Sequence, residues 1–195
     1  MVTVEEVGRS LRGTAALVSR RPDALAEFDV SRQGFARSFA AFLFTIPALV
    51  VTVALARREL GLSVEGLVVF DDARLLVAAG IAHAASLLAL PVAMAFIMRG
   101  GPLAIRYAQF AVATNWIAVF GSLLLAVPGA LYLMGLEPRG VVALFVLAFG
   151  LIVLEAQWFA AKVTLGAGSG LALAITALGL CLQVVIHGLF GALVG

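Results

Sequence analysis

The chain has 195 residues, of which 63% are hydrophobic and 12% charged, and its formal net charge is +2 at pH 7. Its mean hydropathy is +1.13, whereas a soluble globular domain is about 45–50% apolar, so the composition excludes an ordinary water-soluble domain and indicates a membrane protein. The lack of a long basic run argues against nucleic-acid binding, and the single cysteine, Cys181, excludes a disulfide framework within the chain.

Residues 1–36 are expected to form a cytoplasmic N-terminal arm with an amphipathic helix. Thr3 and Glu6 have the spacing of a capping box. Apolar side chains then recur on one helical face, at Val4, Val7, Leu11, Ala15 and Val18. Two arrangements remain open: the helix lies on an anionic membrane surface, or it packs on the cytoplasmic ends of the bundle.

Residues 37–195 are expected to form a transmembrane helix bundle of about five spans, so the fold class is all-α. A helix needs about 20 apolar residues to cross a bilayer, and helices satisfy their backbone polar groups within lipid. The runs of sufficient length are Ser38–Ala56, Leu75–Met98, Gln109–Met134, Val141–Ala161 and Leu171–Val194. The third could break at Pro128, and the second, rich in Ala, is expected at the bundle centre.

The loop cations predict an orientation with the N-terminus in the cytoplasm and the C-terminus outside. Nine cations fall on the N-terminal side of this topology and four on the other. The first group is Arg9, Arg12, Arg20, Arg21, Arg32, Arg37, Arg99, Arg106 and Lys162, and the second is Arg57, Arg58, Arg74 and Arg139. The bias toward Arg, Ala, Leu, Val and Gly suggests a GC-rich bacterial genome, and therefore a bacterial inner membrane.

Glu155 in the fourth span is the first candidate functional residue, because a carboxylate inside a bilayer is costly and needs a partner or a proton. Asn115 in the third span lies at matching depth, about 9 Å from the cytoplasmic end. We therefore expect Glu155 to face the bundle interior and to form a hydrogen bond with a group on the third span. Lys162, two turns away on the same face, is an alternative partner.

Two histidines form a second candidate layer, at about 10–12 Å from the outer ends of their spans. His83 lies in the second span and His187 in the fifth, with Gln183 one turn away on the same face. The two rings are expected at similar depth, where they could face each other. The simpler interpretation is that these groups and Asn115 only form hydrogen bonds between helices.

No catalytic, metal or cofactor motif is present. Ser169 lies in a Gly-rich segment that resembles a rhomboid-type serine motif, but the first Gly of that motif is Ala167 here. The nearest histidine, His187, would lie about 27 Å away along one helix, outside the reach of a serine–base pair. Ser169 is instead expected to cap the fifth span. With two histidines in all, a zinc site is not expected.

The five-span layout with a cytoplasmic arm resembles the Yip1-like membrane proteins. The segment from Phe28 to Phe39 is also similar to pre-membrane segments of bacterial membrane proteins. The Asp-Leu-Tyr-Gly-Pro-type motif of eukaryotic Yip1 proteins is absent, so the resemblance transfers no functional residue. It implies a non-enzymatic role in membrane traffic or organisation.

These features are consistent with two functions. The first is a non-enzymatic scaffold without cofactors, whose partners are the lipid bilayer and other membrane proteins or further copies of the chain. The second is a small transporter or channel subunit that uses Glu155 and the His pair. A cavity reaching Glu155 would favour transport, whereas paired polar groups in a dry bundle would favour the scaffold.

Overall fold

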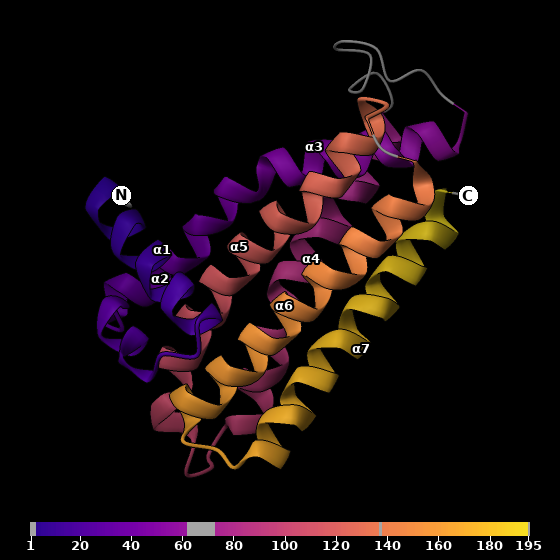
Figure 1. The fold of residues 1–195 in the computed structure, drawn as a ribbon. Helices are drawn as coiled ribbons and strands as arrows, with labels where there is room; N and C mark the ends of the chain where they lie inside the picture. The colour runs from indigo at the N-terminus through magenta and orange to yellow at the C-terminus, as the bar shows by residue number, and fades with distance from the viewer. Residues whose placement is uncertain (1–2, 62–72, 137, 195) are drawn as a thin grey trace.

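The computed structural model describes residues 3–61, 73–136 and 138–194, and all regular structure in these ranges is helical (Figure 1). The predicted all-α fold is therefore confirmed. In chain order the elements are α1 (Val4–Val18), the 3₁₀ helix η1 (Pro22–Glu27), α2 (Arg32–Ala40), η2 (Ala41–Thr45), α3 (Ile46–Glu59), α4 (Ala73–Met98), η4 (Ala104–Arg106), α5 (Tyr107–Leu133), α6 (Arg139–Leu165) and α7 (Ser169–Val194).

Five segments of this part of the chain are long and apolar enough to cross a membrane, as the sequence predicts. They are Arg32–Glu59, Ala73–Met98, Ala104–Leu133, Arg139–Leu165 and Ser169–Ala192. A 27-residue helix such as α6 is about 40 Å long, so it extends beyond the roughly 30 Å hydrocarbon core at its ends. The protein is thus a multi-pass membrane protein.

The bundle is organised around α5, which packs against α3, α4 and α6 and also against the N-terminal helices. The apolar window of α5 is 56% buried, compared with 28% for that of α4, so the expectation that the second span forms the centre is wrong. Every residue from 110 to 117 in α5 is buried. The reason is that the arm covers a side of α5 that the other spans leave open, which helical periodicity alone does not reveal.

The first span changes helix type midway. Helix α2 ends at Ala40, the 3₁₀ helix η2 follows, and α3 begins at Ile46 with Pro47 in its first turn. Since proline has no backbone N–H and fits the first turn of a helix, Pro47 marks a new start within the span. By contrast α4 continues through Pro91 and α5 through Pro128, so the third span does not break.

Two boundaries differ from the sequence-based expectation. The helix of the first span begins at Arg32, inside the expected 1–36 arm, because Ser31 caps it. At the other end of the chain α7 begins at Ser169, and the Gly168 carbonyl accepts the first helical hydrogen bond, from the Ala172 N–H. The residue at the cap position of α7 is therefore Gly168, one residue before the expected Ser169.

The arm, residues 3–31, lies against the flank of the bundle (Figure 1). Helix α1 packs on α5 and α6. We call the end of the bundle nearer to the arm the proximal end; it holds the α4–α5 and α6–α7 connections. The distal end holds the α5–α6 connection and the C-terminus (Figure 1).

Candidate functional site at the junction of arm and bundle

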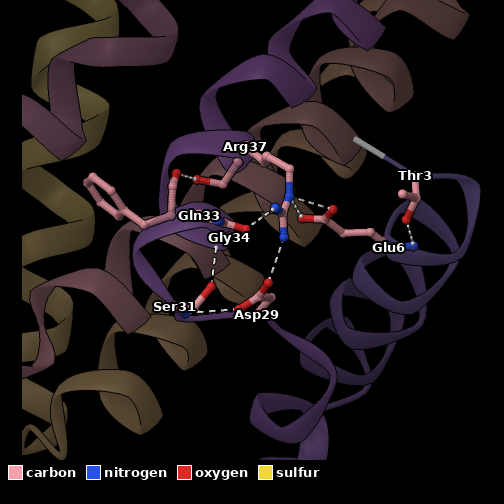
Figure 2. Close-up of polar contacts among 9 residues, drawn as sticks. Thr3, Glu6, Asp29, Ser31, Gln33, Gly34 and Arg37 are labelled. Carbon is pink, nitrogen blue, oxygen red and sulfur yellow. Dashed lines mark hydrogen bonds and ion pairs between the residues drawn. The ribbon is translucent and has the colours of Figure 1, made fainter. Parts of the chain in front are cut away.

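An ion-pair cluster around Arg37 joins the arm to the first span (Figure 2). Arg37 Nε lies 2.7 Å from Glu6 Oε2 in α1, and Arg37 Nη2 lies 2.8 Å from Asp29 Oδ2 in the segment before α2. The Glu6 side chain is only 9% exposed. An unpaired carboxylate at such a position would be costly, so Arg37 holds α1 against the first span.

The turn into α2 builds this cluster. The Ser31 N–H donates to Asp29 Oδ1 at 2.9 Å, and Ser31 Oγ accepts from the Gly34 N–H at 3.1 Å, so Ser31 is the N-cap of α2. Hydrogen bonds from Ser31 lower the pKa of Asp29 below its ordinary value, and the nearby Arg37 charge adds to this effect. A Cβ atom at Gly34 would lie closer than 3.0 Å to Asp29 atoms, including its backbone oxygen, so this turn requires glycine.

One turn further along α2, a buried hydrogen bond connects the first span to α5. Asn115 Nδ2 donates to Ser38 Oγ at 2.9 Å, and the Ser38 hydroxyl donates to the Phe35 carbonyl at 2.7 Å. Because that hydroxyl hydrogen is already used, Ser38 can only accept from Asn115. The Asn115 Oδ1 atom has no partner among the described residues. Asn115 thus acts as a link between helices α2 and α5.

Helix α1 docks through a face that combines polar side chains with the fully buried Leu17. Its buried residues are Glu6, Ser10, Gly13, Thr14 and Leu17. Thr14 satisfies its hydroxyl within the helix by donating to the Ser10 carbonyl at 2.9 Å. The apolar stripe, which the sequence left open to face either the membrane surface or the bundle, is partly turned outward, since Val4 is 89% and Leu11 46% exposed. The reason is that α1 must carry Glu6 to Arg37, which fixes the rotation of the helix.

The end of α1 reaches the fourth span through Arg20. The Arg20 N–H donates to the Leu17 carbonyl, and the Arg21 N–H donates to the Ala16 carbonyl at 2.8 Å, the bonding pattern of a Schellman motif. Arg20 is at its left-handed position, with φ of 57°, where glycine is usual and another residue costs about 1–2 kcal/mol. In this conformation the Arg20 guanidinium contacts the Glu155 carboxylate.

Glu155 therefore has a different partner from the expected one. It forms an ion pair with Arg20 of the arm, whereas Asn115 bonds Ser38, so the prediction that Glu155 bonds the third span is wrong. The carboxylate side chain is 42% exposed and lies about 15 Å along α6 from Leu165. Lys162 is not the cationic partner of Glu155, since its ammonium lies over the Trp158 ring, 5.1 Å from the ring centroid. The partner comes from the arm because α1 packs on α6.

The histidine layer lies between the first span, α4 and α7. His83 Nε2 is 2.7 Å from Thr45 Oγ at the end of η2. Gln183 Nε2 donates to the Ser86 carbonyl at 2.8 Å, which aligns α7 with α4. His187 lies one turn from Gln183, so this bond also places His187 at a depth similar to that of His83. The two histidines therefore lie in one layer, and Gln183 is the bridge between their helices.

Two cavities on the described surface of the bundle are lined by residues other than Glu155. The first, of about 290 Å³, is bounded mainly by apolar side chains of α4 and α7, with Met94, Met98 and Ile175 among them. The second, of about 390 Å³, lies between the first span and α4 and contains His83. Among the described residues, no group of three or more His, Cys, Asp and Glu side chains could hold a metal ion.

The sequence-based candidates are thus divided between two places. Asn115 and Glu155 contact the junction, while His83, His187 and Gln183 lie in the histidine layer. Arg37, Ser38 and Arg20 were missed as site residues. The available signal was the segment from Phe28 to Phe39, which holds the Asp, Ser, Gly and Arg of the cluster.

Comparison with known proteins identifies no family for this chain. The chain matches no family model, and neither the curated proteins nor the solved structures contain a match.

Proposed function

We propose that the protein is a non-enzymatic scaffold that organises partners in the bacterial inner membrane. The proposal rests mainly on one ion pair: Arg20 of the arm neutralises Glu155, the carboxylate within the spans. A transport site needs a polar group that a solute can reach. Here the ion pair occupies Glu155, and the two cavities described above are lined by other residues.

The other polar groups of the spans support the same proposal. Asn115 donates to Ser38, Gln183 donates to a backbone carbonyl and His83 bonds Thr45. Such bonds between helices contribute roughly 0.6 kcal/mol each in membrane proteins, which suits a structural role. The resemblance to Yip1-like proteins agrees with this role but transfers no residue.

The orientation that goes with this proposal has the arm in the cytoplasm, with nine cations on that side and four on the other. A Cys181→Ala protein with a cysteine at Arg9 or at Leu136 tests it, because both positions are exposed. We expect a membrane-impermeant maleimide to label the Leu136 position on intact cells and the Arg9 position only after lysis. The reverse pattern would overturn the orientation.

The scaffold proposal is tested by reconstitution and by crosslinking. In proteoliposomes with an internal pH-sensitive dye, we expect no proton flux above protein-free vesicles. In cells, a photoreactive residue at Leu147, which is 63% exposed on α6, should crosslink one membrane protein or a second copy of this chain. A reciprocal crosslink from the partner must return to α6.

A small transporter or channel subunit is the second candidate, favoured by the cavity at His83, which lies beside the 3₁₀ segment of the first span. A proton or ion flux that Glu155→Gln abolishes, in a protein that still folds, would replace the scaffold proposal with this one.

A further inference from the structure

The cavity between the first span and α4 has a construction that the scaffold role does not require. Phe39, Ala40, Phe42 and Leu43 form one wall, and the other wall comes from α4, with Gly80, His83, Ala84, Leu87 and Leu88. All of these side chains are apolar except His83. The cavity volume of about 390 Å³ falls within the range of small-molecule sites, about 300–1,000 Å³.

Small residues make the hollow. Ala40 and Ala84 are exposed within it, and a Cβ atom added at Gly80 would meet no other atom within 4 Å. Beside them, the Phe39 and Phe42 rings meet edge to face, with centroids 5.9 Å apart. The cavity therefore combines an open floor with a firm aromatic side.

The hydrogen bonds around Thr45 fix the chemistry of His83. The Thr45 hydroxyl donates to the Phe42 carbonyl at 2.6 Å, so its oxygen must accept from His83 Nε2, which is 2.7 Å away. A neutral imidazole that carries its proton on Nε2 has an unprotonated Nδ1, which is a hydrogen-bond acceptor. Within the described chain no hydrogen bond reaches Nδ1.

The depth of His83 restricts what can reach it. The residue lies ten positions into α4, which runs from Ala73 to Met98, so it is about 15 Å from one end of the helix and about 22 Å from the other. This is close to the middle of a roughly 30 Å hydrocarbon core. A ligand at this depth must dissolve in lipid and enter from the bilayer.

We propose that this cavity binds a lipid-soluble alcohol or phenol, whose hydroxyl donates to His83 Nδ1 and whose apolar body lies against Phe39, Phe42 and Leu87. An ordinary acyl chain would fill the hollow but would leave the acceptor unused. A hydroxyl compound satisfies it, and the apolar walls accept the remainder of the molecule. The site is independent of the scaffold proposal, because it involves neither the arm nor Glu155.

The test uses two photoreactive probes, a long-chain alcohol that carries a diazirine and the methyl ether of the same compound. The full-length protein in lipid nanodiscs is irradiated with each, and the labelled peptides are located by mass spectrometry. We expect labels at residues 39–43 and 80–88. One hydrogen bond is worth about 0.5–1.5 kcal/mol, so the alcohol should label roughly 2- to 10-fold more than the ether.

Two variants and a matched control complete the experiment. Ala84→Leu should fill the cavity and reduce labelling to background, whereas Ala174→Leu, in the other cavity, should leave it unchanged. His83→Phe should make alcohol and ether label equally. If His83→Phe fails to fold, competition by the unlabelled alcohol against its ether on the native protein decides the same point.

Equal labelling by alcohol and ether in the native protein would overturn the proposal and leave only contact with lipid chains. Labelling that persists in Ala84→Leu would also overturn it, because the probe would then lie outside this cavity.

Discussion

The junction of arm and bundle and the distal half of α6 are built in opposite ways. At the junction, residues 110–117 of α5 are all buried, and charged side chains from α1 and α2 pair beside them. In the distal half of α6, residues 143–148 are all exposed and all apolar. Lipid can solvate the second region without any partner, whereas the first needs a specific partner for each charge. The difference shows where this protein depends on its exact residues.

The largest expected effect is a difference between leucine-to-alanine substitutions on the two faces of α1. Leu17 is fully buried and Leu11 is 46% exposed, so Leu17→Ala should weaken arm docking by about 3 kcal/mol and Leu11→Ala by less than about 0.5 kcal/mol. Subtilisin cleavage of the arm in mild detergent measures this, since the rate follows the open population. We expect about 100-fold faster cleavage for Leu17→Ala only. Equal effects would mean that α1 docks through its apolar stripe.

The second prediction contrasts two ion pairs. Arg37→Met leaves the nearly buried Glu6 carboxylate without its partner, which should cost roughly 3 kcal/mol, the lower end for a broken buried pair. Arg139→Met breaks a pair with Glu59 whose side chains are 75% and 66% exposed, and should cost about 0–1 kcal/mol. Thermal unfolding in detergent compares the two. Similar losses would show that the junction pair is no better shielded than the surface pair.

Glycines in the two regions should also respond differently to alanine. Gly34→Ala forces a Cβ atom into Asp29 and should destabilise the turn by about 1–3 kcal/mol. Gly150→Ala in α6 meets nothing within 4 Å and should stabilise the helix by about 0.5–1 kcal/mol. The shift in the thermal unfolding midpoint shows whether each substitution destabilises or stabilises the protein. A neutral Gly34→Ala would contradict the close approach at the start of α2.

The smallest expected effect is a pH dependence at the junction. Because Ser31 and Arg37 lower the pKa of Asp29, its stabilising contribution is present above the unfolded value of about 3.9 and is lost as the pH falls through the lower folded value. Asp29→Asn should therefore be less stable than the native protein at pH 7 by about 1 kcal/mol. The difference between the unfolding midpoints of the two proteins should begin to narrow near pH 3.9 and should vanish only below the lowered folded pKa of Asp29. A difference that does not narrow at all as the pH falls below about 3.9 would exclude this linkage.

Sequence reasoning identified the helices well because apolar runs of about 20 residues have few alternatives. It also placed His83 and His187 in one layer, since depth follows from helix rise. It failed for Glu155, because the partner Arg20 is 135 positions away in sequence, and helical periodicity does not tell on which span the arm rests. The rotation of α1 was missed for a related reason, since the single pair of Glu6 and Arg37 overrides its apolar stripe.

The central claim is that Arg20 of the arm holds Glu155, and a charge exchange tests it most directly. In nanodiscs, Arg20→Glu and Glu155→Arg should each speed subtilisin cleavage of the arm about tenfold, which corresponds to about 1.4 kcal/mol. The double variant, with the charges exchanged, should return to within about twofold of the native rate, because the two groups are then paired again. If the effects of the two single variants simply add in the double variant, Arg20 and Glu155 do not interact and the account is contradicted.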